Sequence, residues 1–114
     1  MTGPSYQQTM HALADNTRTQ VFELLRSGPK AVREIAERLP VSRPAVSQHL
    51  KVLKAAGLVQ EEARGTQRIY SVRREGLAAL RSWLEEFWDE ALDAYKAEVL
   101  KHEQNNRHKS NRQN

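Results

Sequence analysis

The chain has 114 residues, of which 39% are hydrophobic and 28% charged, and this length gives room for one domain with its own core. It contains no cysteine, which excludes disulfide bonds, thiolate metal sites and cysteine catalysis. No apolar run approaches the roughly 18 residues of a membrane-spanning helix, and the first residues lack the pattern of a signal peptide. A cytoplasmic protein without a membrane partner is therefore expected.

The net charge of +4 is spread unevenly along the chain. Residues 1–40 carry +1 and residues 41–74 carry +5, whereas residues 75–100 carry −5 and residues 101–114 carry +3. A basic middle beside an acidic segment is typical of a polyanion-binding surface that lies next to a separate, non-binding element.

The first three predicted elements are short helices, around residues 6–14, 21–25 and 32–39. Each of these stretches has apolar residues at helical spacing. Gly28 ends the second helix, and Pro40 ends the third because the residue before a proline avoids the helical region.

A fourth helix is predicted over residues 42–56, after a turn of about three residues. Ser42 is a good N-cap, Pro44 suits the first turn, and Gly57 supplies the stop. From Leu58 the apolar period changes to about two. Two such arms around Gly65 predict a β-hairpin.

The last predicted helix runs from about Arg74 to His102 and has a broad apolar stripe. Residues 103–114 are polar and basic, and they are expected to form a disordered tail. The order of four helices, a hairpin and a long helix therefore predicts one domain over residues 1–102. Its fold class is mainly α with a β-hairpin wing (α+β), in a winged helix-turn-helix arrangement.

The helix over residues 42–56 has an outer face without any acidic residue. Val46, Leu50 and Leu53 share the inner face, and the outer face carries Arg43, Pro44, Ser47, Gln48, Lys51 and Lys54. Short hydroxyl and amide side chains can reach base edges in the major groove of DNA, while cations at the margins meet phosphates. Ser42 could also hold the helix N-terminus against a phosphate. A solvated face that happens to lack acids is the alternative, but the neighbouring helix and hairpin favour DNA.

The predicted hairpin turn offers a second basic surface. Arg64, Gln67 and Arg68 surround Gly65, so a projecting wing could reach an adjacent minor groove or its phosphates. A loop needs polar residues in any case, and a merely solvated turn stays an alternative for these residues taken alone.

Two stretches carry recognisable motifs. Residues 13–25 read LADNTRTQVFELL, and residues 41–59 read VSRPAVSQHLKVLKAAGLV, followed by RIYSV at residues 68–72. Together these motifs resemble the ArsR family of prokaryotic winged-helix repressors, over about residues 9–100. Asn16 stands where the family's opening motif usually has proline, and asparagine also suits a helix start.

The resemblance implies a homodimer that binds double-stranded operator DNA and represses its own or a neighbouring operon. It places the base-reading residues at Arg43, Pro44, Ser47 and Gln48, and the wing at residues 64–68. His49 belongs to the same motif, but its angle on the helix places it beside Val46, so a DNA contact and a packed histidine stay equally open.

The resemblance does not extend to metal sensing. The two cysteine positions of the family's sensing motif fall on Ala31 and Arg33, so that site is absent. A second type of site would use acidic and histidine side chains on the last helix, and here these are Asp89, Asp93, Glu98, His102 and Glu103. An ordinary solvated helix face explains them better. No metal or other cofactor is expected, and a small-molecule effector stays open.

The apolar stripe of the last helix is too wide for a single small domain to cover. Pairing with a second copy would bury it. The residues predicted at that dimer interface are Tyr6, Met10, Leu13, Trp83, Phe87, Trp88, Leu92, Tyr95 and Val99. A core helix with a frayed end is one alternative, and a protein-interaction module that uses this aromatic helix is another. An enzyme is not expected, because Ser47 and His49 project about 200° apart on one helix and no carboxylate is positioned to orient the histidine.

Overall fold

The computed structural model describes the backbone of residues 3–112 and the side chains of residues 3–106. One compact unit ends at Arg81, and a second begins at Ser82. The elements are α1 (Tyr6–Ala12), α2 (Asn16–Leu24), the 3-10 helix η1 (Leu25–Ser27), β1 (Lys30–Ala31), α3 (Val32–Arg38), α4 (Arg43–Ala55), β2 (Val59–Arg64), β3 (Gln67–Val72) and α5 (Arg74–Arg112). The predicted order of elements is confirmed, and β1 and η1 are additions to it.

Side-chain caps set the starts of the first, second and fourth helices. Ser5, Asp15 and Ser42 each have extended backbone and accept a hydrogen bond from the backbone N–H three residues later. The Arg18 N–H donates to Asp15 Oδ1 at 2.9 Å, and this bond holds the pKa of the Asp15 carboxyl below its usual value. The polar segment that begins at Asp15 is therefore the start signal of α2.

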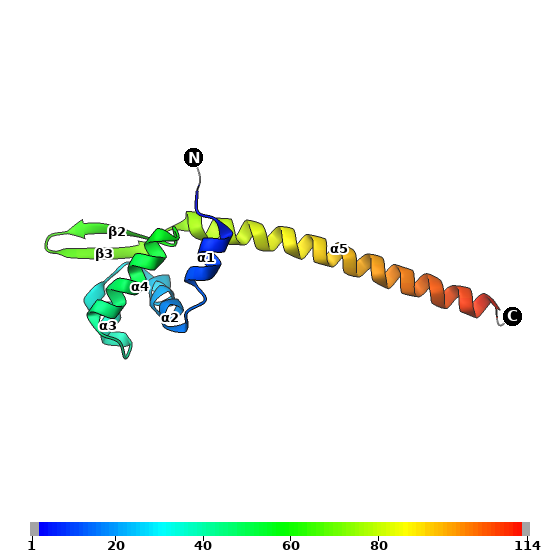
Figure 1. Cartoon of the computed structure of the whole chain (residues 1–114), viewed down its shortest axis with the longest axis horizontal. Coiled ribbons are helices and arrows are strands. Elements are labelled where there is room, and N and C mark those ends of the chain that lie inside the picture. The colour runs from blue at the N-terminus through cyan, green and yellow to red at the C-terminus, as the bar shows by residue number, and fades with distance from the viewer. Residues whose placement is uncertain (1–2, 113–114) are drawn as a thin grey trace. The chain divides into compact units, whose positions relative to one another are not determined.

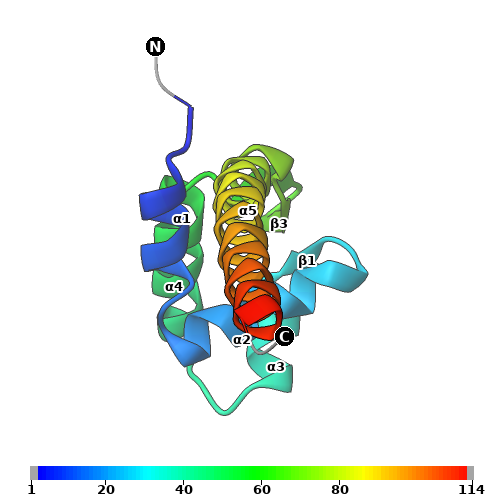
Figure 2. The same ribbon diagram turned by 90° about the vertical axis from the view of Figure 1, so that its right-hand side faces the viewer.

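The core of the first unit lies between α2, α3, α4 and the base of the hairpin (Figures 1 and 2). The side chains that it buries almost completely are Val21, Leu25, Ile35, Val46, Leu50, Leu53, Leu58 and Val59. Burying one such side chain stabilises the fold by about 1.5–3 kcal/mol. The predicted inner face of the fourth helix is confirmed, because Val46, Leu50 and Leu53 have no exposed area.

The sheet has three antiparallel strands in the order β1-β3-β2. In the hairpin, Val59 pairs with Val72 and Arg64 with Gln67, and Gly65 lies at the turn with φ of 60°. β1 adds Lys30 opposite Tyr70 on the other edge of β3. This edge ties the segment before α3 to the wing.

A close glycine contact joins the start of α5 to the turn after α4. The Gly76 N–H donates to the Gly57 carbonyl at 3.0 Å, and a Cβ added at Gly76 would lie 2.5 Å from the same oxygen. Gly57 itself has φ of 77°. Both positions therefore require glycine, one for close backbone approach and the other for its conformation.

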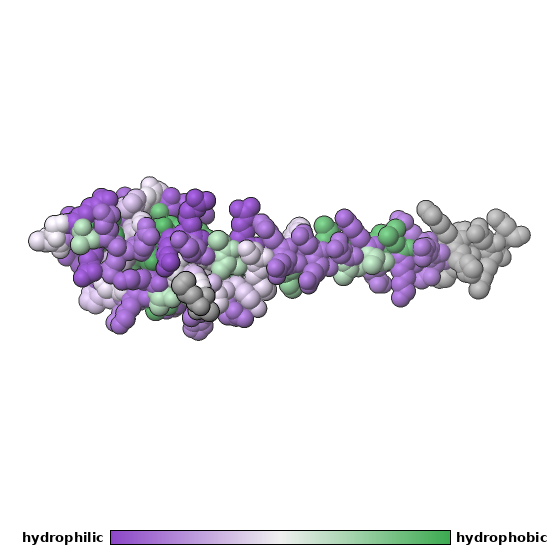
Figure 3. Space-filling view, turned by 90° about the horizontal axis from the view of Figure 1, so that it is seen from above, coloured by the Kyte–Doolittle hydropathy of each residue, from purple (hydrophilic) through white to green (hydrophobic). Residues whose placement is uncertain are grey.

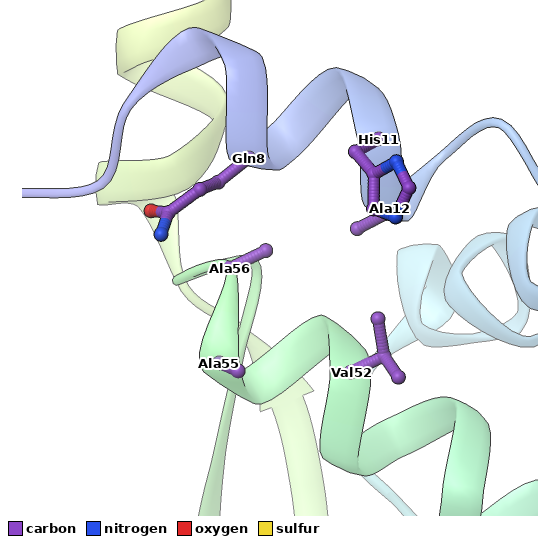
Figure 4. Close-up of a pocket in the computed structure, with 6 residues that line it drawn as sticks. All are labelled: Gln8, His11, Ala12, Val52, Ala55 and Ala56. Atoms are coloured by element: carbon purple, nitrogen blue, oxygen red, sulfur yellow. The ribbon is translucent and has the colours of Figure 1, made fainter.

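α1 lies alongside α4 in the first unit (Figure 2). Ala12 and Ala56 are buried where the two helices meet. Their small side chains leave a hollow of about 150 Å³, with Gln8 and His11 on the α1 side and Val52 on the α4 side (Figure 4). His11, which belongs to no motif in the sequence, thus lines this hollow.

α5 continues to Arg112, well beyond the predicted end at His102. The expectation that residues 103–114 form a disordered tail stays a prediction, and residues 113–114 lie outside the described residues. No glycine or proline follows Gly76, and glutamate, glutamine, lysine and arginine are good helix formers, so nothing in the polar segment stops the helix. Among the described residues, no helix is both long enough and apolar enough to cross a membrane.

Candidate nucleic-acid interface

The outer face of α4 is open to solvent. Eight residues of this helix are predicted to contact DNA, and all of them except His49 are exposed. The seven exposed residues are Ser42, Arg43, Pro44, Ser47, Gln48, Lys51 and Lys54. The Ser42 hydroxyl accepts from the Ala45 N–H at 3.2 Å, so its cap role is satisfied within the chain. Residues 39–42 join α3 to α4, which gives the two helices the connection of a helix-turn-helix.

His49 differs from the other predicted residues of this helix. It is half-buried, and a positive charge on its ring would be one of the lesser causes that lower the pKa of Asp15, after the hydrogen bond from Arg18. This position agrees with the inner-half placement expected from the helical angle.

A polar groove joins the fourth helix to the wing. It has a volume of about 430 Å³, and three arginines line it, Arg33 from α3, Arg43 from α4 and Arg68 from β3. Ser47 and Gln67 also line it, so predicted residues of the helix and of the wing meet here. No acidic residue is among the lining side chains, so the groove offers positive charge and hydrogen-bond donors to an anion.

Glu61 connects the wing to the far end of α4. Lys54 Nζ donates to Glu61 Oε1 at 2.5 Å, and Arg68 Nη1 lies 3.2 Å from the same oxygen. The Tyr70 hydroxyl also hydrogen-bonds to this carboxylate. Lys54 and Arg68, which the sequence predicts to contact DNA, thus share Glu61 of the same chain as an ion-pair partner.

These contacts shift the ionisation of the groups involved. The Lys54 hydrogen bond, followed by that of Tyr70, lowers the pKa of the Glu61 carboxyl to about 2. Burial, and then the hydrogen bond to Glu61, raises the pKa of the Tyr70 hydroxyl. Glu61 therefore stays ionised at neutral pH and holds both cations through charge.

The tip of the wing carries exposed polar side chains. Arg64, Gln67 and Arg68 are all exposed, and Arg64 Nη2 lies 3.6 Å from Glu62 Oε2. This ion pair is between side chains that are 61% and 70% exposed, so it contributes little energy and leaves the guanidinium accessible.

Sequence reasoning missed three residues of this surface: Arg33, Glu61 and Tyr70. Arg33 lies on the helix before the predicted recognition helix, and Glu61 and Tyr70 lie within the strands. The pairing of Glu61 with Tyr70 across the two strands follows from the hairpin register, which could have suggested their contact. Nothing in the local sequence around Arg33 predicts that it lies beside Arg43 and Arg68.

The residues predicted for a dimer interface fall into two groups. Within the first unit, Tyr6 and Leu13 are half-buried and Met10 is 42% exposed. Leu13 already packs against the core of its own unit.

The second unit carries the remaining interface residues. Phe87, Trp88 and Tyr95 are 58%, 65% and 67% exposed, and Leu92 and Val99 are also exposed. Trp83 is half-buried, and its ring stacks on Phe87 with 5.6 Å between centroids. Figure 3 shows hydrophobic patches interrupted by hydrophilic ones along this part of α5. These side chains form an exposed apolar stripe.

The acidic and histidine side chains of α5 do not converge. Within residues 3–106, no group of three or more His, Cys, Asp or Glu side chains is placed to hold a metal ion. The absence of a metal site stays a prediction for the chain as a whole.

Residues 15–61 match the family described as "Bacterial regulatory protein, arsR family". The HTH-type transcriptional regulator Rv2034 of Mycobacterium tuberculosis is 55% identical over 91 residues, which are 80% of this chain and 85% of that protein. The transcriptional repressor SdpR of Bacillus subtilis is 32% identical over 76 residues, which are 67% of this chain and 84% of that protein.

A similar fold is known from a solution structure of the homodimeric winged helix-turn-helix DNA-binding domain Mb0332 from Mycobacterium bovis. It is 30% identical, has a TM-score of 0.58, and covers 77% of this chain and 82% of its own. The sequence similarity to Rv2034 covers most of the chain and not the helix-turn-helix alone. The fold and the acid-free face of α4 agree with membership of the same family. The chain therefore belongs to the arsR family of bacterial regulatory proteins and is a DNA-binding transcriptional regulator with a winged helix-turn-helix fold.

Proposed function

We propose that the protein is a homodimeric repressor that reads a palindromic operator through the helix over residues 42–56 and the wing over residues 64–68, and that it controls its own or a neighbouring operon. The observation that carries this proposal is the acid-free outer face of α4, which continues into a groove lined by arginines. A solvated face tolerates any mixture of charges, whereas acidic side chains on it would repel the phosphates of a polyanion.

The side chains of this surface divide into two roles. Ser47 and Gln48 are short, exposed and central on α4, so they are suited to hydrogen-bond base edges in the major groove. The cations around them are suited to phosphates, which fix the register of the protein on the duplex. The phosphate-binding side chains in this proposal are Arg43, Lys51, Lys54, Arg64 and Arg68.

Four further members of the predicted surface have limited roles or none at the DNA. Ser42 and Pro44 shape the start of α4, and the helix N-terminus adds a partial positive charge there. Gln67 hydrogen-bonds DNA from the wing. His49 is half-buried, and we assign it to packing rather than to a DNA contact.

Dimerisation is supported by the exposed apolar stripe on α5. An exposed patch that includes Phe87, Trp88 and Tyr95 is unfavourable in a monomer, and a symmetric contact with a second copy would cover it. The similar M. bovis domain is homodimeric, and the similar B. subtilis protein is a repressor. Two copies would present two recognition helices to successive major grooves.

The experiment that tests this proposal is selection of bound sites from random duplex DNA with purified protein, followed by affinity measurements across salt concentrations. We expect an inverted repeat whose half-sites are separated by about one helical turn or a multiple of it. The slope of log K against log salt should be several units, because each neutralised phosphate adds about −0.9. A flat slope, or selected sites without symmetry, would contradict the proposal.

The exposed aromatic stripe also favours a second candidate, a protein-interaction module with the winged unit as scaffold. That candidate predicts tight association with another protein and negligible affinity for DNA. The same salt titration separates the two functions. Location in the cytoplasm and the absence of a cofactor stay predictions, and whether the protein has a small-molecule effector stays open.

A further inference from the structure

We propose that Arg33 of α3 binds a DNA backbone phosphate together with Arg43 and Arg68, across the groove between α4 and the wing. This inference rests on the proposed function and adds to it a residue from the first helix of the helix-turn-helix. The ligand is a phosphodiester of duplex DNA, and the three guanidinium groups act as one clamp.

The clamp is built from three elements that lie far apart in the sequence. α3 supplies Arg33, α4 supplies Arg43, and β3 supplies Arg68, and all three side chains line the same groove of about 430 Å³. The neutral donors Ser47 and Gln67 line it as well. A phosphate oxygen can therefore meet charged and neutral donors from several directions.

The three arginines keep donors available for such a ligand. Within the described part of the chain, the guanidinium group of Arg43 makes no ion pair or hydrogen bond. Arg33 Nε lies 4.0 Å from Glu37 Oε1, at the limit of an ion pair, and the two side chains are 58% and 67% exposed. Such a pair contributes little, so a phosphate can compete with it.

Arg68 is held in place by a different contact. Its Nη1 lies 3.2 Å from Glu61 Oε1, and Glu61 is itself anchored by Lys54. A guanidinium has five N–H donors in a rigid fork, so one nitrogen can stay with Glu61 while the other faces the groove. Glu61 is therefore a positioning residue for the clamp.

A backbone phosphate fits the position of the groove better than a free anion does. Ser47 belongs both to this groove and to the exposed face of α4 that we assign to base edges, so a duplex bound to that face brings its backbone to the groove. In the helix-turn-helix arrangement the first helix crosses the DNA backbone, and α3 holds that place here. Three guanidinium groups that keep free donors suit the negative charge that recurs along the backbone.

The test compares Arg33→Ala with Arg38→Ala, since both are exposed arginines of α3 and only Arg33 lines the groove. Affinity for the selected site and for random duplex DNA is measured from low to high salt. We expect Arg33→Ala to weaken both by roughly tenfold, as for loss of one charge-assisted hydrogen bond. Its salt slope should fall by about 0.9, the contribution of one phosphate. Arg38→Ala should change affinity less than threefold and leave the slope within error.

A second variant and a folding control distinguish loss of the charge from loss of the fold. Arg33→Gln keeps much of the aliphatic stem and removes the charge, and it should reproduce both effects. Thermal unfolding of each variant shows whether the fold is retained. Inorganic phosphate at matched ionic strength serves as a free-anion probe, and it should not compete with DNA beyond its ionic strength.

The possible failures are distinguishable. If the wild-type protein has no salt-dependent DNA affinity, the proposed function itself fails. If the wild type binds DNA but both Arg33 variants keep its affinity and slope, only the clamp is overturned. Loss of the selected site alone, with an unchanged slope, would also overturn it, as would direct competition by inorganic phosphate.

Discussion

Glu61 is the residue at which side chains of the wing and of α4 meet. The sequence presents Lys54 and Arg68 as two independent cations, but both contact the same carboxylate oxygen of Glu61. The Glu61 side chain is only 19% exposed. Pairing two cations with one acid keeps a net positive charge on the surface while fixing where that charge lies. The geometry of the proposed interface therefore depends on an acidic residue.

The substitution Glu61→Gln should make the free energy of unfolding depend less on pH in the acidic range. The folded-state pKa is about 2, below the ordinary value of 4.5, so the ionised carboxylate stabilises the fold fully above pH 4.5. That stabilisation is lost as pH falls from 4.5 towards 2. We expect the free energy of unfolding of Glu61→Gln to be lower than that of the wild type at pH 7 and to fall less between pH 5 and pH 2.5, as measured by urea unfolding.

The matched control is Glu62→Gln. Glu62 is the next residue on β2, and it contacts Arg64 at 3.6 Å in an exposed ion pair. Its loss should change stability little at either pH. Equal acid profiles for wild-type protein and Glu61→Gln would show that the internal pairing contributes no stability.

Gln48 and Arg68 should differ in how they affect DNA recognition. Gln48→Ala should reduce discrimination between the selected site and random DNA by about 1–3 kcal/mol, because a base contact is lost. Arg68→Ala should weaken both DNAs alike, because a phosphate contact carries no sequence information. Competition binding measures both effects.

Gln20→Ala, which truncates an exposed glutamine of α2, is the control for Gln48→Ala. It should leave both affinities unchanged. A uniform loss in the Gln48 variant would assign that side chain to the backbone instead of the bases.

At the scale of elements, the signals that worked are local ones. Ser42, Pro44 and Gly57 predicted both ends of α4, and the change of period at Leu58 predicted the hairpin. A cap or an alternating pattern depends on neighbouring residues only, so it can be read without knowing the fold.

The elements that were missed have no such signal. β1 has two residues and exists because it pairs with β3, and this pairing depends on tertiary packing. The predicted end of α5 at His102 is too early, because the only sequence signal for it is the loss of apolar residues. Polarity removes the burial that holds a tail in place, but it does not break a helix when glycine and proline are absent.

Gly76→Ala tests the glycine contact between α5 and the turn after α4. An alanine Cβ would lie 2.5 Å from the Gly57 carbonyl oxygen, and both groups belong to the backbone, so one segment must shift. The gain of about 1 kcal/mol in helix propensity should be outweighed by an overpacking cost of about 1–3 kcal/mol. We expect a lower midpoint in thermal unfolding.

Gly3→Ala is the control for this substitution, since an added Cβ there meets nothing within 4 Å. Its midpoint should match that of the wild type. A stabilised Gly76→Ala variant would mean that the start of α5 moves away from the turn at little cost.

At the scale of the whole molecule, Trp88 tests the proposed dimer. Trp88 is 65% exposed within the second unit and lies on the apolar stripe of α5. A glutamate at this position would bury a charge in the proposed interface, which is costly when no partner is present. We expect wild-type protein to sediment at twice its 13.1 kDa mass and Trp88→Glu to sediment at 13.1 kDa.

Ala97→Glu adds the same charge on the opposite face of the helix. At 100° per residue, position 97 lies about 180° from position 88. Ala97 is exposed, and the variant should sediment as the wild type does. A wild-type protein that stays at 13.1 kDa at micromolar concentration would refute the dimer, and with it the expectation of a symmetric operator.

The sequence by itself determined the order of the elements, the acid-free face of α4 and the resemblance to the ArsR family. All three are local or linear properties, because periodicity, caps and motifs are read along the chain. Only the tertiary structure decided which charges meet. It brings Arg33, Arg43 and Arg68 to one groove and gives Lys54 and Arg68 a shared partner in Glu61. Such contacts depend on how helices and strands pack, and a sequence pattern fixes the faces of each element but not which faces come together.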